Sequence, residues 1–186
     1  MSAAVQPSFA AARAGRALAT VLLFQGAWFA CVLGAARGHA LWGVAAVALA
    51  VAVLLVASRR RGADLRLVAA ALATGLVWDS ALAHAGLVVY ASPGPWSGAA
   101  PAWILALWAL WGVVLREPLR WLHGRPLVSM LLGGIGGAAS YEAAARLGAC
   151  RFDDAPTAWA VLAAGWALIT PLQLALARRL DREATR

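Results

Sequence analysis

Charged residues are scarce in this chain. They make up 13% of its 186 residues, and 63% of the residues are hydrophobic. A water-soluble domain carries about 25% charged residues, so this composition excludes a soluble globule, which would need more polar surface. Because no long polar segment could fold separately, the sequence indicates a single membrane domain with short tails.

Lysine is absent, and all sixteen basic residues are arginines. The formal net charge of +8 would suggest a nucleic-acid partner if the protein were soluble. Here the arginines flank apolar stretches, so we interpret them as residues that meet anionic lipid headgroups and set orientation. We therefore expect the lipid bilayer, and no nucleic acid, as partner. The exclusive use of arginine, with abundant alanine, is typical of a GC-rich bacterial genome.

Motifs for metal binding and catalysis are missing from the sequence. Its three histidines are too few and too scattered for a metal cluster, and no metalloprotease, serine-hydrolase or phosphate-loop pattern is present. The cysteines, Cys31 and Cys150, form no redox motif and are best interpreted as small apolar fillers, with a disulfide between them as the alternative. We expect no metal and no cofactor.

Six long apolar stretches dominate what is present. Each is about the length that a helix needs to cross a hydrocarbon core of roughly 30 Å. The stretches cover residues 17–36, 40–58, 67–90, 99–115, 127–149 and 157–177, with tails at 1–16 and 178–186. The sequence thus predicts an all-α, polytopic integral membrane protein, a bundle of six transmembrane helices.

The placement of the arginines predicts the orientation of this bundle. Thirteen of the sixteen lie in the two tails and in the second and fourth connections, whereas two lie in the other three connections. Positive charge resists translocation, so the arginine-rich side should face the cytoplasm. We expect both termini to be cytoplasmic, in a multi-pass protein of the bacterial inner membrane.

Several polar residues fall within the predicted spans, where a charge costs about 2.5–3.5 kcal/mol near the helix centre. They define a candidate binding pocket in the outer half of the bilayer: Asp79, Ser80, His84, Tyr141, Glu142 and Arg146. The two carboxylates and the arginine lie on stripes of small residues, which are expected to face other helices.

Two interpretations stay open for each charged group of this pocket. Glu142 and Arg146 are four residues apart, the favourable order for an ion pair on one helix, and this pair is either purely structural or serves a binding or chemical task. Asp79 has no partner on its own helix. It either stays protonated in apolar surroundings or reaches Arg146 across the bundle.

Glycine and tryptophan clusters mark two further features. Small residues let helices approach closely in lipid, so we expect the glycines of the fifth stretch to pack on a neighbouring helix, with room for a ligand or acyl chain as the alternative. These glycines are Gly133, Gly134, Gly136 and Gly137. Trp108 and Trp111 share one helix face and fit either helix packing or an aromatic wall around a ligand.

Several short motifs are similar to those of a known family. They are Trp-Asp-Ser at 78–80, the run Pro-Ala-Trp-Ile-Leu-Ala-Leu-Trp at 101–108, Tyr141, Arg-Leu-Gly-Ala at 146–149 and residues 24–35. On these motifs the chain resembles a family of small bacterial inner-membrane proteins catalogued only as a domain of unknown function. The family has no assigned activity or catalytic residues. Its genes are often found near cyclopropane-synthase-like lipid methyltransferases, so the resemblance implies a lipid-related role. Glu142 departs from the uncharged residue expected there.

These observations favour a non-enzymatic membrane protein that binds or moves a small or lipidic molecule through a polar pocket. One alternative is a membrane-embedded enzyme that modifies lipids, with Asp79 or Glu142 as general acid or base. Another is an accessory or scaffold subunit whose glycine-rich helix packs on a membrane partner. Because six short helices make a small bundle, self-association into a homo-oligomer is also expected.

Overall fold

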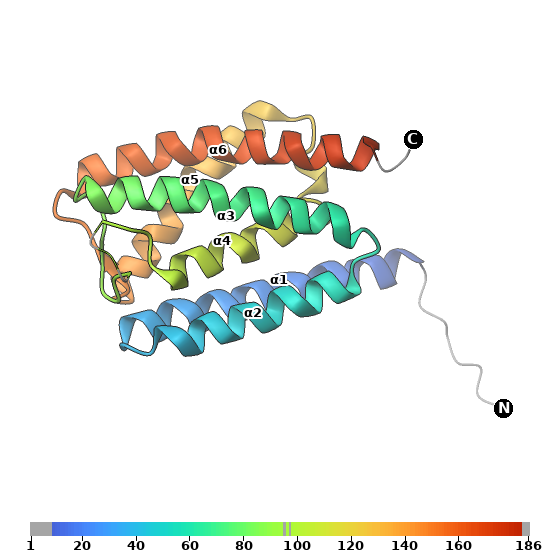
Figure 1. The fold of residues 1–186 in the computed structure, drawn as a ribbon. Helices are drawn as coiled ribbons and strands as arrows, with labels where there is room; N and C mark the ends of the chain where they lie inside the picture. The colour runs from blue at the N-terminus through green and yellow to red at the C-terminus, as the bar shows by residue number, and fades with distance from the viewer. Residues whose placement is uncertain (1–8, 95, 97, 184–186) are drawn as a thin grey trace.

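The described part of the chain forms a bundle of six α-helices with a very small β-sheet at one end (Figure 1). A computed structural model describes residues 9–94, 96 and 98–183. In chain order the elements are α1 (Phe9–Ala36), α2 (Ala40–Ala57), α3 (Arg61–His84), β1 (Val89–Tyr90), α4 (Ala102–Val114), the short 3-10 helix η1 (Arg120–Leu122), α5 (Pro126–Arg146), β2 (Cys150–Arg151) and α6 (Ala155–Glu183).

The helices pack as three neighbouring pairs. The first pair is α1 with α2, the second is α3 with α4, and the third is α5 with α6. Contacts between α2 and α4 join the first pair to the second, and contacts between α3 and α6 join the second to the third. Figure 1 shows the β-sheet at one end of the bundle and the α2–α3 connection at the opposite end, where α6 also finishes.

Within the residues that the structure describes, four helices are long and apolar enough to cross a membrane. They are α2, α3, α6 and, within α1, the segment Ala17–Ala36. Of the other two, α4 has 13 residues, which span about 20 Å, less than a full hydrocarbon core. Large apolar side chains cover much of the surface: Leu41 is 79% and Leu172 69% exposed. The six helices expected from the sequence are thus confirmed. Length and hydropathy together single out four of them as able to cross a membrane, whereas α5, with its 21 residues, is long enough but less apolar.

The ends of α3 and α5 correct the expected boundaries. Both helices stop earlier than the predicted stretches 67–90 and 127–149, because Gly86 and Gly148 adopt left-handed backbone conformations with φ of 69° and 88°. Such glycines terminate helices. The residues that follow form β1 and β2, which pair antiparallel with Tyr90 opposite Cys150. The all-α prediction therefore missed a two-stranded sheet.

Helix α5 approaches α6 through its glycines. A Cβ atom on Gly133 would lie 2.3 Å from Thr170 Oγ1, one on Gly134 would lie 3.0 Å from the Ala163 carbonyl oxygen, and one on Gly137 would lie 2.1 Å from Trp166 Cγ. Gly136 differs, since a Cβ there would meet nothing within 4 Å. Three of the four glycines therefore face α6, and the fourth faces open space.

Candidate functional site

A buried carboxylate joins four elements near the β-sheet end of the bundle. Asp79 of α3 has no exposed surface and accepts three hydrogen bonds, each 2.5 Å long. The donors are the hydroxyls of Tyr90 and Tyr141, both to Oδ1, and the indole Nε1 of Trp108, to Oδ2. We call these four residues the carboxylate cluster. Among the described residues no cation pairs with Asp79, so these three donors satisfy the oxygens of its buried side chain.

Local structure explains how each donor reaches Asp79. Gly75, one turn before Asp79 on α3, makes room for the Trp108 ring, since a Cβ there would lie 2.1 Å from Trp108 Cδ1. Tyr90 is held by its pairing with Cys150, and the Ala91 amide donates to the Ala149 carbonyl at 2.9 Å. The small sheet therefore ties the Tyr90 strand to the end of α5, the helix that carries Tyr141.

A long groove lies beside this cluster. Its volume is about 790 Å³, within the range of roughly 300–1,000 Å³ that is usual for small-molecule sites. Helices α1, α4, α5 and α6 and the η1 segment contribute its lining. The aromatic members are Phe24, Trp28, Phe29, Tyr90, Trp103, Trp108, Trp111, Trp121, Tyr141 and Trp166. We call this feature the aromatic groove.

The groove exists because two of the helices around it do not pack on each other. Helix α5 packs mainly on α6, and α1 packs mainly on α2, which leaves their facing sides as walls. Trp108 of α4 stacks on Trp166 of α6 with ring centroids 4.9 Å apart, and Trp111 meets Trp166 edge-on at 5.6 Å. These stacked indoles lie between α4 and α6 and keep the two helices apart.

The residues of the predicted pocket divide into two groups. Asp79 and Tyr141 meet directly, and Tyr141 lines the groove. Ser80 and His84 are absent from the lining. The Ser80 hydroxyl accepts a hydrogen bond from the Ala100 amide at 2.9 Å, and His84 is an exposed residue at the end of α3 rather than a buried one.

Glu142 and Arg146 form the expected ion pair, with Arg146 Nε 2.7 Å from Glu142 Oε1. Trp159 Nε1 donates to Glu142 Oε2 at 3.1 Å, so α6 also holds this carboxylate. Arg146 lines the groove and its side chain is 79% exposed. The alternative pairing of Asp79 with Arg146 is wrong for the described residues, because Asp79 is held by Tyr90, Tyr141 and Trp108.

Sequence reasoning missed Tyr90. It considered Trp108 only for helix packing or for an aromatic wall around a ligand, and not as a partner of Asp79. The predicted stretch 67–90 ends at Tyr90, which was given no role, whereas the structure places Tyr90 in β1. The signal available was Gly86 followed by Val88 and Val89, since a glycine followed by β-branched residues is typical of a helix end and a strand.

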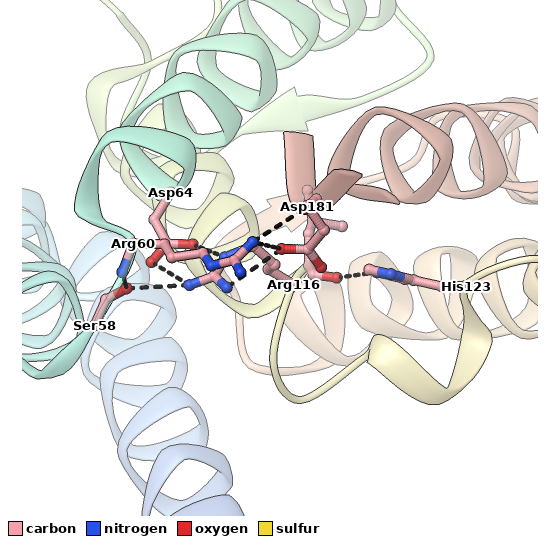
Figure 2. A network of polar contacts seen from close by, with 7 residues as sticks. Ser58, Arg60, Asp64, Arg116, His123 and Asp181 are labelled. Atoms are coloured by element: carbon pink, nitrogen blue, oxygen red, sulfur yellow. Dashed lines mark hydrogen bonds and ion pairs between the residues drawn. The ribbon is translucent and has the colours of Figure 1, made fainter. Parts of the chain in front are cut away.

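A second polar cluster occupies the opposite end of the bundle, where Figure 2 shows its side chains converging from several elements. Arg116, after α4, donates from Nε to Asp64 Oδ1 at 2.7 Å and from Nη2 to Asp64 Oδ2 at 3.2 Å. It also contacts Asp181 of α6 at 3.4 Å and Ser58 at 3.2 Å. Arg60 donates to the Asp181 carbonyl at 3.0 Å. We call these five residues the arginine network.

This network corrects the interpretation that the arginines at helix ends all face lipid headgroups. The side chains of Arg116 and Asp64 are each only 7% exposed. Hydrogen bonding to Asp64 raises the pKa of Arg116 above its ordinary value, while burial opposes part of that shift. Arg116 therefore stays charged and joins α3, α4 and α6 from the inside.

The arrangement of the histidine, cysteine and acidic side chains bears on metal binding and on the cysteine pairing. No group of three or more His, Cys, Asp or Glu residues that could hold a metal ion occurs in the part of the chain that the structure describes. Cys31 and Cys150 are both buried and free, so the disulfide alternative is wrong.

The fold and its groove define a small helical protein with four helices suited to crossing a membrane and a polar cluster at each end. Residues 17–172 match the family described as a protein of unknown function, DUF2878, and the chain belongs to this family. This confirms the resemblance to an uncharacterised family. No curated protein and no solved structure matches the chain.

Proposed function

We propose that the chain is an integral membrane protein that crosses the bilayer six times, with both termini in the cytoplasm. The arginine-rich ends of the helices support this orientation, since positive charge resists translocation. The end with β1 and β2 then faces the periplasm. A reporter fused between Arg59 and Arg66 should be cytoplasmic, and a periplasmic reporter there would reverse every depth assigned below.

We propose further that the aromatic groove binds a lipidic molecule. The single observation that carries this proposal is the groove itself: about 790 Å³ of space with a largely apolar, aromatic lining beside helices suited to a bilayer. Ligand pockets commonly have this volume, and apolar linings favour apolar ligands. In the proposed topology the walls α1 and α5 meet the hydrocarbon, so a lipid chain could enter sideways from the bilayer.

The geometry supports binding better than acid–base catalysis. Asp79 has no exposed surface and lies behind Tyr90, Tyr141 and Trp108, so its carboxylate does not touch the groove. Glu142, the other carboxylate considered for catalysis, is bound by Arg146 and Trp159 and does not line the groove. The two carboxylates therefore do not converge on a common reacting atom, as general acid–base work requires.

A matched pair of glycine substitutions tests this proposal. Gly136→Leu places a side chain in the groove, while Gly26→Leu places one on an exposed part of α1, and a Cβ at either position would meet nothing within 4 Å. We expect wild-type protein and Gly26→Leu to retain a lipidic molecule through detergent exchange, detected by native mass spectrometry, and Gly136→Leu to lose it. Equal retention by both variants, or an empty wild-type protein, would refute the proposed binding role.

A further inference from the structure

We propose that the occupant of the aromatic groove is a single-chain lipid with an anionic oxygen head, a carboxylate or a phosphate, and that Arg146 binds this head. This inference rests on the proposed lipid-binding function and specifies its ligand. Arg146 is the one charged side chain in the groove lining among the described residues.

The geometry of Arg146 suits such a head group. Its Nε is occupied by Glu142 Oε1 at 2.7 Å, and Glu142 is in turn fixed by Trp159 Nε1. Within the described residues neither Nη atom of Arg146 has a hydrogen-bond partner. A guanidinium with two free, parallel N–H groups matches the two oxygens of a carboxylate or phosphate. Glu142 thus acts as a positioning residue that orients Arg146 without facing the groove.

The two ends of the groove differ in chemistry, which gives a bound amphiphile a direction. Arg146 lies at the β-sheet end together with Tyr90 and Tyr141, whereas Leu119 and Trp121 lie at the other end. A negative head is complementary to the first end, and a hydrocarbon tail is complementary to the second. In the proposed topology Arg146 ends α5 at the periplasmic surface, the depth of lipid headgroups.

The length of the groove fits one extended chain. Its lining follows α5 from Leu132 to Arg146, which is about 21 Å at 1.5 Å per residue. One leaflet contributes only about 15 Å of a hydrocarbon core of 30 Å. A single extended chain anchored at Arg146 therefore fits within the length of the groove.

Fluorescence quenching in nanodiscs of phosphatidylcholine tests the inference, because six of the ten tryptophans line the groove. Brominated palmitate and brominated hexadecanol have similar chains but differ in head group. We expect wild type to bind palmitate more tightly than hexadecanol. Arg146→Gln should weaken the binding of palmitate at least about tenfold and leave the binding of hexadecanol unchanged. The control Arg151→Gln removes an exposed arginine that pairs with Asp153 and does not line the groove.

Any of three results would overturn the proposal. Arg146→Gln could keep the preference for palmitate, Arg151→Gln could abolish it equally, or inorganic phosphate alone could displace palmitate, which would identify a free anion as the ligand. The role of Glu142 in positioning Arg146 is supported if Glu142→Gln weakens the binding of palmitate and leaves the binding of hexadecanol unchanged. If neither probe quenches wild type saturably and Gly136→Leu behaves as wild type does, the groove binds no lipid and the proposed function itself fails.

Discussion

Removing Arg116 should destabilise the protein more than removing any other single member of the arginine network. Asp64 receives both of its side-chain hydrogen bonds from Arg116, and both side chains are 7% exposed. Arg116→Met leaves the Asp64 charge buried without a cation, a change that costs about 3–5 kcal/mol in comparable ion pairs. Asp64→Asn should cost less, about 1–3 kcal/mol, since Arg116 keeps Asp181 and Ser58.

The assay uses the two buried free cysteines as reporters of unfolding. A thiol-reactive dye follows unfolding in mixed micelles as the fraction of sodium dodecyl sulfate rises, because Cys31 and Cys150 become accessible. A cost of about 3–5 kcal/mol changes the unfolding equilibrium constant by about two to nearly four powers of ten. The control is Arg66→Gln, which breaks an exposed 3.7 Å pair with Glu183 and should cost less than about 1 kcal/mol.

A double variant separates a stranded charge from lost packing. Asp64→Leu combined with Arg116→Met removes both charges, and replacing a buried ion pair by apolar residues is often neutral or stabilising. The double variant should therefore be more stable than Arg116→Met alone. If Arg116→Met costs no more than Arg66→Gln, or if the double variant is the least stable of the set, a buried charge pair between Arg116 and Asp64 does not stabilise the bundle.

The remaining predictions concern the glycines and a thiol. Gly137→Ala should destabilise the protein by about 1–3 kcal/mol in the same assay, because its Cβ would lie 2.1 Å from Trp166 Cγ. Gly136→Ala should leave the stability unchanged or raise it by up to about 1 kcal/mol, because a Cβ there meets nothing within 4 Å. Equal effects would contradict the packing of α5 on α6. Burial raises the pKa of the Cys150 thiol to about 12. In Cys31→Ala protein, maleimide labelling at about pH 8 should therefore be slower by about three orders of magnitude than in unfolded protein and should rise with pH, and equally fast labelling of both states would contradict this.

Hydropathy located the helices but could not place their ends. Hydropathy measures how strongly a segment prefers hydrocarbon to water. It therefore placed the start of α3 at residue 67 and missed the polar residues from Arg61 onward, which are helical as well. At the other end, residues 87–90 are as apolar as the helix before them, so only Gly86 marks the change to β1. Helical and extended segments of equal hydropathy are distinguished by backbone conformation, which glycine signals and a hydropathy average ignores.

The candidate site was predictable only in part for a similar reason. Asp79 stands out because a carboxylate in a predicted span is costly, and Tyr141 because it lies on the glycine-rich helix. Tyr90 reaches Asp79 because β1 pairs with β2, and Trp108 reaches it because Gly75 leaves room for its ring. Both arrangements exist only in the folded chain. Asp64 was overlooked because its arginine partner, 52 residues away in sequence, was interpreted only as an orientation signal.

The two polar clusters together explain why a groove this large stays open in such a small bundle. Tyr141 and Trp108 share the Asp79 carboxylate, which fixes the spacing of α3, α4 and α5 at one end. At the other end Arg116 fixes the spacing of α3, α4 and α6. If α5 moved toward α1 to close the groove, Tyr141 would leave Asp79, which has no exposed surface, without its second hydroxyl donor. The cost of stranding a buried carboxylate therefore opposes the collapse of the apolar walls.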